Sequence, residues 1–496
     1  MGVASRKSVA ACLAQASGES GPRLKRSLGS LSLTAFGVGC TIGAGIFSLT
    51  GDVAAHHSGP AVSLAFVLAS ICCFFAGLCY AEFAAMVPIA GSAYSYAYVT
   101  LGELVAWIIG WCLVLEWGLA ASVVAISWSG YAQAALRDLG FALPAVLTQA
   151  PFAVDAGHHV VSTGAWFDLP ALLIVLVCTA LPLAGTRTSA AVNDVIVIAK
   201  VIALTVLVVV GARYVHPENW HPFVPPGSGT FGEFGWSGVL SGAGIMFFAY
   251  IGFDGVSTLA EDARDPQRTL PVSLFASLFI VTVLYVSVSL IVTGLADYRS
   301  LAVSDPLYYA LSAAHASLRP VQVLVGVVAI AGLVPVVLAS IVGQVRIFYA
   351  MARDGLLPPS FARLSTSGQT PVVGTLVTGG IAAVIAALVP LATLGELVSI
   401  GTLLAFAIVC VGIIILRRIA PDARRPFRTP WVPWIPLAGV ASCLVLMVGL
   451  PLGTWVRLIV WVIIGLAVYL GYGRHHSHLA VAKHKLAAAA RPREPR

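Results

Sequence analysis

The sequence predicts an all-α integral membrane protein, and three observations lead to this fold class. First, 59% of the 496 residues are hydrophobic and only 10% are charged, whereas soluble domains average about 25% charged residues. Second, apolar stretches of about 20 residues, the length that an α-helix needs to cross a bilayer, recur along the chain. Third, the basic residues gather between these stretches and at both ends. A soluble globular fold does not fit these observations.

Twelve apolar stretches are long enough to be membrane spans. The third and the eighth exceed the thickness of a bilayer, so we expect them to tilt or to project. The last two are separated only by a short turn near Pro451 and Thr454. The predicted spans are 31–50, 59–86, 101–131, 168–185, 191–212, 237–260, 271–296, 320–351, 371–391, 395–416, 434–453 and 455–473.

The positions of lysine and arginine predict which side of the membrane each loop faces. With the N-terminus inside, 22 of the 28 Lys and Arg residues fall on the inner side and 5 on the outer side. Cytoplasmic loops carry the excess of basic residues, so both termini are predicted to be cytoplasmic. The remaining basic residue, Lys200, lies inside the fifth predicted span. No apolar core or cleavage motif of a signal peptide is evident in the first thirty residues.

Other features of the sequence give no indication of a metal, a cofactor or a nucleic acid as partner. The net charge of +7 follows from membrane topology. Eight of the nine cysteines lie in apolar segments, where small packing residues are expected. The histidines lie mostly in predicted outer loops or the C-terminal tail, without cysteines or carboxylates at ligand spacing. We therefore expect no cofactor and no metal site, and the oligomeric state stays open.

Two predicted spans contain clustered glycines near their middle, where good helix formers are normally found. The first contains TIGAGIFSLTG, with Gly43 and Gly45, and the sixth contains GAGIMFFAYIGFDGVS, residues 242–257. Each of these spans begins a unit of five, and an odd number of spans forces the two units into opposite orientations. Glycine-interrupted helices at matching positions of two halves are typical of transporters with inverted repeats. Close packing between helices is the alternative explanation of the glycines.

A helix that is broken at mid-membrane exposes backbone groups that lipid cannot satisfy, so the break has to line a cavity. The first N–H groups of a half-helix form the positive end of its dipole and suit a carboxylate. Carbonyls freed at the opposing break suit an ammonium group. A ligand that carries both groups on one carbon is an α-amino acid, so the sequence predicts an amino acid site at the two breaks.

Five motifs carry a resemblance to a known family: GVGCTIGAGIFSLTG (37–51), YAEFAAMVPIAGSAYSYAYVTLGELVAWIIGW (80–111), FFAYIGFDGVSTLAEDARDPQRTLP (247–271), GQVRIFYAMARDGLLP (343–358) and RRPFRTPWVPWIP (424–436). The chain resembles the amino acid–polyamine–organocation (APC) superfamily, and within it the bacterial form of the cationic amino acid transporter family. This resemblance implies a LeuT-type fold, a five-plus-five inverted repeat with two extra spans. The implied boundaries are a cytoplasmic tail 1–30, repeats 31–212 and 237–416, extra spans 434–473 and a basic cytoplasmic tail 474–496.

The resemblance also implies residues of the substrate site. The substrate carboxylate would meet N–H groups around Thr41, Gly43, Ala44 and Gly45. The substrate ammonium would meet carbonyls near Cys40, Phe248, Ala249 and Ile251. An aromatic gate or pocket wall would be formed by Phe247, Phe248, Tyr250 and Phe253, although ordinary packing is the expected role of at least two of these four.

Ionisable residues inside the predicted spans are further candidates. Lys200 lies roughly 12 Å deep in its span at about 1.5 Å per residue. In sodium-coupled relatives of the superfamily a sodium ion lies near this place, and a lysine stands in for it in the resembling bacterial transporters. Lys200 is therefore the predicted proton-coupling group, next to Ser340, and a lysine that snorkels is the alternative. Glu116 either faces a cationic side chain of the substrate or joins a structural network, and Glu82 is expected to gate or to brace.

The residues that shape the side-chain pocket complete the prediction. Leu333 on the eighth span narrows the pocket, and Cys112 stands where the family often has an acid; both favour small or medium neutral amino acids over arginine. We expect a secondary transporter of the bacterial inner membrane that imports amino acids by proton symport through alternating access. An exchanger, a cationic amino acid transporter and a non-transporting sensor are the alternatives. No arrangement of residues indicates an enzyme.

Overall fold

The computed structural model describes most of the chain between Gly29 and His478. The described ranges are 29–86, 92–154, 160–185, 190–259, 263–365, 370–423 and 425–478. Outside them lie the N-terminal tail up to residue 28, the C-terminal tail beyond residue 478, and the charged residues Arg187, Asp262 and Arg424.

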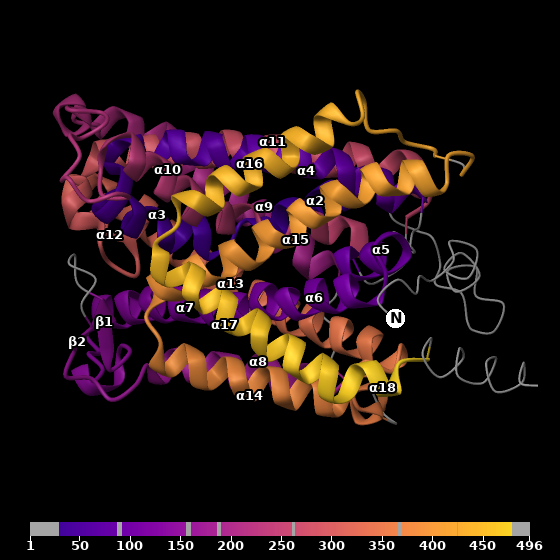
Figure 1. Ribbon diagram of the computed structural model, residues 1–496. Helices are drawn as coiled ribbons and strands as arrows, with labels where there is room; N and C mark the ends of the chain where they lie inside the picture. The colour runs from indigo at the N-terminus through magenta and orange to yellow at the C-terminus, as the bar shows by residue number, and fades with distance from the viewer. Residues whose placement is uncertain are drawn as a thin grey trace, which may run out of the picture.

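The described residues form an elongated and mostly helical molecule, whose long helices run in one general direction (Figure 1). The two strands among these residues, β1 (Phe152–Val154) and β2 (Val160–Ser162), pair antiparallel with Phe152 opposite Ser162. This hairpin lies at the end of the molecule away from the start of α2 (Figure 1). The predicted all-α class is confirmed.

The helices follow the predicted spans closely. They are α2 (Ser30–Thr41), α3 (Thr50–Val53), α4 (Val62–Met86), α5 (Ser92–Thr100), α6 (Glu103–Leu113), α7 (Leu119–Asp138), α8 (Leu169–Leu183), α9 (Ala190–Gly211), α10 (Gly235–Met246), α11 (Pro266–Leu295), α12 (Pro306–Ala314), α13 (Arg319–Arg353), α14 (Val372–Leu388), α15 (Leu391–Ile419), α16 (Trp434–Gly449), α17 (Leu452–Val468) and α18 (Arg474–His476). Short π-helical or 3-10 segments link some of them, among these η1 (Gly45–Leu49), η2 (Ala54–Ser58), η4 (Val114–Gly118), η8 (Phe247–Tyr250) and η9 (Asp254–Leu259).

Eight helical segments in the described ranges are long and apolar enough to cross a membrane. One of them, Gly45–Met86, joins the second half of the first predicted span to the whole of the second. Four shorter apolar helices, α2, α8, α14 and α16, occupy the predicted spans that remain. The first predicted span was given an end at residue 50, whereas helical structure continues to Ser58. These segments make the chain a multi-pass membrane protein.

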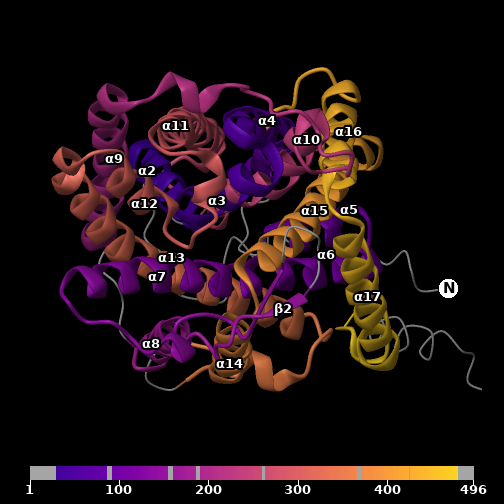
Figure 2. The same ribbon diagram turned by 90° about the vertical axis from the view of Figure 1, so that its left-hand side faces the viewer.

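Two groups of helices pack against each other in the end view (Figure 2). In one group α4 packs along α11, with α2 and α10 beside them. In the other group α7 packs along α13, with α8 and α14 beyond them. Buried apolar side chains from both groups form one continuous core. The candidate site lies inside this core, where α2 and α10 face α7 and α13.

A buried carboxylate ties the C-terminal end of α4 to the segment that follows α15. Glu82 is fully buried and accepts hydrogen bonds from Arg417, whose Nε lies 3.1 Å from Oε1 and whose Nη2 lies 2.7 Å from Oε2. The Nε of Arg425 lies 3.2 Å from Oε1, and the N–H of Thr429 donates to Oε2 at 2.7 Å. Glu82 therefore braces the loop between α15 and α16.

Glu82→Ala should lower the free energy of unfolding by about 3–5 kcal/mol, because two guanidinium groups lose a buried partner. Thermal unfolding of the detergent-purified protein measures this effect. Asp297→Ala is the matched control, since its ion pair with Arg299 is solvent-exposed and such pairs contribute about 0–1 kcal/mol. Equal unfolding midpoints for the two variants would contradict the bracing role of Glu82.

Candidate functional site

The first glycine-rich stretch contains a break in the helix. α2 ends at Thr41, and Ile42 has an extended backbone with ψ of 94° after donating its N–H to Val38 O at 2.9 Å. Helical geometry resumes at Ala44 and continues as π turns through η1. The first N–H groups of a helix have no acceptor within it, so those that follow Ile42 have to be satisfied from outside.

The second glycine-rich stretch is broken as well. α10 gives way to the 3-10 segment η8, after which Ile251 is extended with ψ of 133° and Gly252 has φ of 108°. This φ lies in the region that glycine adopts without steric cost. A Cβ at Gly252 would also lie 2.9 Å from the carbonyl oxygen of Cys40. Gly252 therefore turns the chain and lets it approach the first break.

The two breaks touch at Gly45. A Cβ at this position would overlap Ala249 and would lie 3.1 Å from its backbone nitrogen. At Gly43 the nearest atoms are Val336 Cγ1 at 3.4 Å and Thr41 O at 3.9 Å, which leaves room for a methyl group. Close packing thus explains the glycine at position 45. It does not explain the glycine at position 43, which faces a cavity.

That cavity lies where the two breaks meet and holds about 460 Å³ of space between its lining atoms, part of which is open to solvent. The predicted residues that line it are Cys40, Thr41, Gly43, Ala44, Gly45, Phe248, Ile251 and Ser340. The remaining lining residues are Trp117, Ala120, Val124, Gly252, Val336 and Ala339. The structure therefore brings both predicted breaks together around one cavity.

Buried side chains satisfy the carbonyl groups that the breaks release. The hydroxyl of Tyr285 on α11 lies 2.7 Å from Thr41 O and 3.0 Å from Ala249 O, so it links the two breaks. The hydroxyl of Tyr131 donates to Phe47 O at 2.7 Å. The carbonyl of Ala249, which was predicted to meet the substrate ammonium, thus accepts from Tyr285, and Ala249 is not among the residues that line the cavity.

Lys200 is buried against the first break. Its Nζ donates to Ile42 O at 2.8 Å and to Gly39 O at 3.1 Å, and the side chain is only 1% exposed. Its aliphatic stem packs on α13 at Gly332, where a Cβ would lie 2.6 Å from Lys200 Cε. The contact with α13 is therefore at Gly332, whereas Ser340 donates its hydroxyl to Val336 O at 2.9 Å. A lysine that snorkels toward solvent does not fit this geometry.

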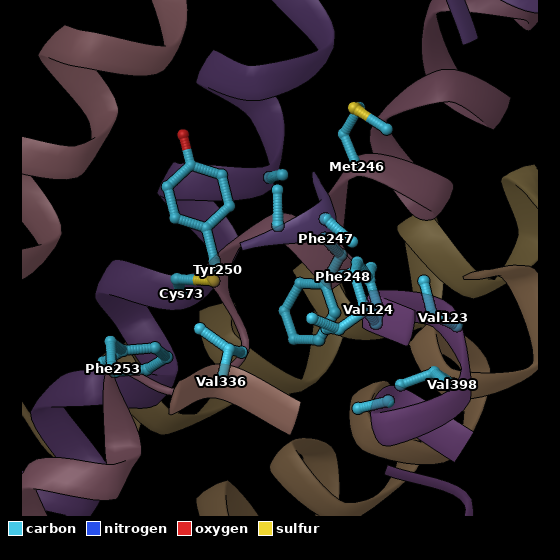
Figure 3. Close-up of a cluster of buried hydrophobic side chains, with 14 of the residues drawn as sticks. Cys73, Val123, Val124, Met246, Phe247, Phe248, Tyr250, Phe253, Val336 and Val398 are labelled. Atoms are coloured by element: carbon cyan, nitrogen blue, oxygen red, sulfur yellow. The ribbon is translucent and has the colours of Figure 1, made fainter. Parts of the chain in front are cut away.

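The aromatic residues of the second break divide between cavity and core. Phe248 lies beside Val124 and Val336 at the cavity wall (Figure 3). Phe247 and Phe253 make edge contacts with Phe406, with ring centroids 5.4 Å and 5.8 Å away. Tyr250 donates its hydroxyl to Phe66 O at 3.0 Å. Three of the four predicted gate or wall aromatics are therefore packed in the core.

Two predicted pocket residues lie next to the cavity wall instead of on it. Leu333 is fully buried in the core, and Val336 and Ala339 line the cavity from the same helix. Glu116 is fully buried in the π turn η4, and its neighbour Trp117 faces the cavity. No pattern in the sequence distinguished these wall residues, because both helices are apolar on all sides.

The fold and the cavity define a class of protein: a multi-pass membrane protein with a small-molecule cavity at the crossing of two broken helices. Residues 28–469 match the amino acid permease family. The chain belongs to this family, within the APC superfamily, whose members are transporters and not enzymes. The predicted membership of the superfamily is confirmed.

Three relatives illustrate the range of the family. The chain is 43% identical to the methylthioribose transporter of Bacillus subtilis, over 92% of this chain and 95% of that protein. It is also 43% identical to the branched-chain amino acid permease BcaP of the same organism, over 96% and 98%. Identity to the vacuolar cationic amino acid transporter 4 of Arabidopsis thaliana is 37%, over 81% of this chain and 64% of that protein.

Gly45→Ala should destabilise the crossing of the breaks by about 1–3 kcal/mol, the usual cost of overpacking, because its methyl group has no space beside Ala249. Gly43→Ala is the matched control, since a methyl group fits there. Thermal unfolding in detergent should show a lower midpoint for Gly45→Ala alone. The reverse order of the two midpoints would show that the crossing is not packed as described.

Proposed function

We propose that the chain has twelve membrane spans in a LeuT-type arrangement, with inverted repeats at 31–212 and 237–416 and two extra spans in 434–473. In support, eight long and four short apolar helices occupy the twelve predicted spans. The two breaks fall in the first span of each repeat and meet at Gly45 and Ala249. A pseudo-twofold axis through the crossing of the first and sixth spans accounts for that contact.

We infer that the cavity binds the α-carboxylate and α-ammonium groups of an amino acid. The observation that carries this inference is the position of the cavity, which begins at the N-terminal end of the outer half of the first span. A helix N-terminus offers N–H groups and a positive dipole end to an anion. The carbonyls of Cys40 and Phe248, on residues that line the cavity, are the candidate acceptors for the ammonium. Phe248 O also accepts from the N–H of Ile251 at 3.1 Å, so it would use its second lone pair.

The wall of the cavity favours a neutral, medium-sized side chain. Away from the breaks it is built from Trp117, Val124, Val336 and small residues, and none of the described lining residues carries a formal charge. A cationic substrate side chain would lose its hydration here without a partner. Branched-chain amino acids therefore fit better than arginine or lysine, which is consistent with the name of the BcaP relative.

A thio-sugar is the second candidate substrate, because one relative of equal identity is named a methylthioribose transporter. A thio-sugar and an aliphatic amino acid both place an apolar group against such a wall. They differ at the breaks, since the thio-sugar has neither carboxylate nor ammonium.

Uptake by the purified protein in liposomes distinguishes the two candidate substrates: the proposal predicts saturable uptake of leucine, isoleucine or valine. It fails if only methylthioribose, or only arginine, is taken up.

Proton symport is the proposed mode of transport, and Lys200 is the proposed group that couples proton movement to substrate movement. A neutral Lys200 would keep two N–H donors, but its hydrogen bonds to Gly39 O and Ile42 O would lose the support of the positive charge and weaken. Its protonation would therefore be tied to the geometry of the first break. We further propose import across a bacterial inner membrane; the distribution of basic residues supports the cytoplasmic position of both termini. Exchange of amino acids is the alternative mode.

Lys200→Ala should reduce uptake driven by an inwardly directed proton gradient by about tenfold or more, a typical size for the loss of a coupling free energy. Exchange against preloaded substrate should be reduced less, because it needs no net proton transfer. Thr205→Ala is the control, since Thr205 is an exposed residue of the same helix. Full gradient-driven uptake by Lys200→Ala would rule out this role.

A further inference from the structure

The loop between α15 and α16 presents two tryptophans to the surroundings. Trp431 is 79% exposed and Trp434 is 71% exposed, and Leu437 extends this apolar surface onto α16. Arg418 at the end of α15 and Arg428 in the loop are exposed as well. We call these five residues the loop patch. It lies at the same end of the molecule as the start of α2 (Figure 1).

The two arginines of the loop patch, Arg418 and Arg428, are next in sequence to two residues that contact each other, Arg417 and Thr429. Arg417 donates to Thr429 O at 2.8 Å and to Glu82 at 2.7 Å. Arg418 and Arg428 are the chain neighbours of Arg417 and Thr429, so the brace at Glu82 holds them on one end of the helix bundle. Glu82 and its partners are mostly buried, whereas Arg418 and Arg428 are exposed and can reach a ligand.

The backbone of the loop has an unfavourable conformation at Trp431, whose side chain is exposed. This residue has φ of 44°, in the left-handed region that bulky side chains rarely adopt. Its carbonyl accepts from the N–H groups of Trp434 at 2.7 Å and Ile435 at 3.2 Å, which fixes the start of α16. Arg425 holds the loop from the other side through the carbonyls of Ala420 at 2.5 Å and Ala423 at 2.9 Å. These hydrogen bonds hold the described parts of the loop on both sides of Trp431, whose side chain is exposed.

The position of the loop patch along the helices identifies its surroundings. It lies where the apolar helix α15 ends and the apolar helix α16 begins, and the ends of apolar helices are where a membrane protein is expected to meet the headgroups. Tryptophan is enriched at this depth because its ring is apolar and its N–H is polar. Basic residues at the same depth attract anionic headgroups.

We propose that the loop patch is a binding site for an anionic phospholipid of the surrounding bilayer. The phosphate of the headgroup lies between Arg418 and Arg428, and the glycerol and upper acyl chains lie against Trp431, Trp434 and Leu437. The combination of cations with an apolar surface at membrane depth favours a lipid over a soluble partner. This inference goes beyond the proposed function and does not depend on which substrate is transported.

The test is stabilisation of the full-length protein in detergent by added phosphatidylglycerol, measured as the unfolding midpoint at increasing lipid concentration. Each basic residue near an anionic lipid surface contributes about fivefold in affinity, so R418Q/R428Q should need about 25-fold more phosphatidylglycerol. Phosphatidylcholine should stabilise neither protein. Added salt should weaken the effect in the wild type.

A second variant, Trp431→Gly, is expected to fold normally, so it separates a loss of lipid binding from misfolding. Glycine accepts φ of 44° without strain, so the unfolding midpoint without lipid should be equal or higher, while the affinity for phosphatidylglycerol falls. The matched control is W236A/R213Q, since Trp236 and Arg213 are exposed on other segments. Wild-type affinity of R418Q/R428Q for phosphatidylglycerol would overturn the proposal. So would equal protection by inorganic phosphate, or a change of oligomeric state caused by the variants with lipid affinity unchanged.

Discussion

The structure depends on one constraint: backbone groups that leave a helix in the membrane interior must still find partners. The break after Thr41 releases carbonyls in the middle of the bundle, and no water from a lipid phase can satisfy them. Lys200 supplies donors to Gly39 and Ile42 from α9, and Tyr285 serves Thr41 and Ala249 from α11. Side chains from two other helices therefore pair with the carbonyls of the break, and we propose that its N–H groups bind the ligand in the cavity.

Because side chains of α9 and α11 pair with the released carbonyls, the proposed cavity has one polar end and one apolar end. One end is formed by residues of the two breaks, and the proposed polar contacts are the N–H groups after Ile42 and the carbonyls of Cys40 and Phe248. The apolar end is made of side chains from α7 and α13. A ligand with adjacent charged groups and an apolar tail can enter such a cavity in one orientation.

Both breaks were predictable from the sequence because glycine has a direct effect on backbone conformation. The glycine-rich segments around Gly43 and Gly252 placed the two breaks within a few residues of their observed positions. Most of the predicted break residues line the cavity. Lys200 was also recognisable, since a lysine deep in an apolar stretch needs partners. Its contact on α13 was placed at Ser340, about two turns from the observed contact at Gly332, because the depth of a residue does not fix the register of a neighbouring helix.

The wall of the cavity was less predictable for a physical reason. Helices buried on all sides carry no apolar periodicity that shows which face points inward. In the third span the π turn η4 adds a residue to one helical turn and changes the face that follows. Trp117 therefore faces the cavity where Glu116 was expected. The partners of the break carbonyls, Tyr285 and Tyr131, were also missed, since single tyrosines in apolar spans have no distinctive spacing.

The central claim is that the breaks recognise the carboxylate and the ammonium of one ligand. The most direct measurement compares the binding of leucine, leucinamide and 4-methylpentanoate to the purified protein by calorimetry, with methylthioribose as a fourth ligand. We expect that leucine binds and that leucinamide, which lacks the carboxylate, and 4-methylpentanoate, which lacks the ammonium, each bind at least about tenfold more weakly. Equal affinity for leucine and leucinamide, or binding of methylthioribose alone, would contradict it.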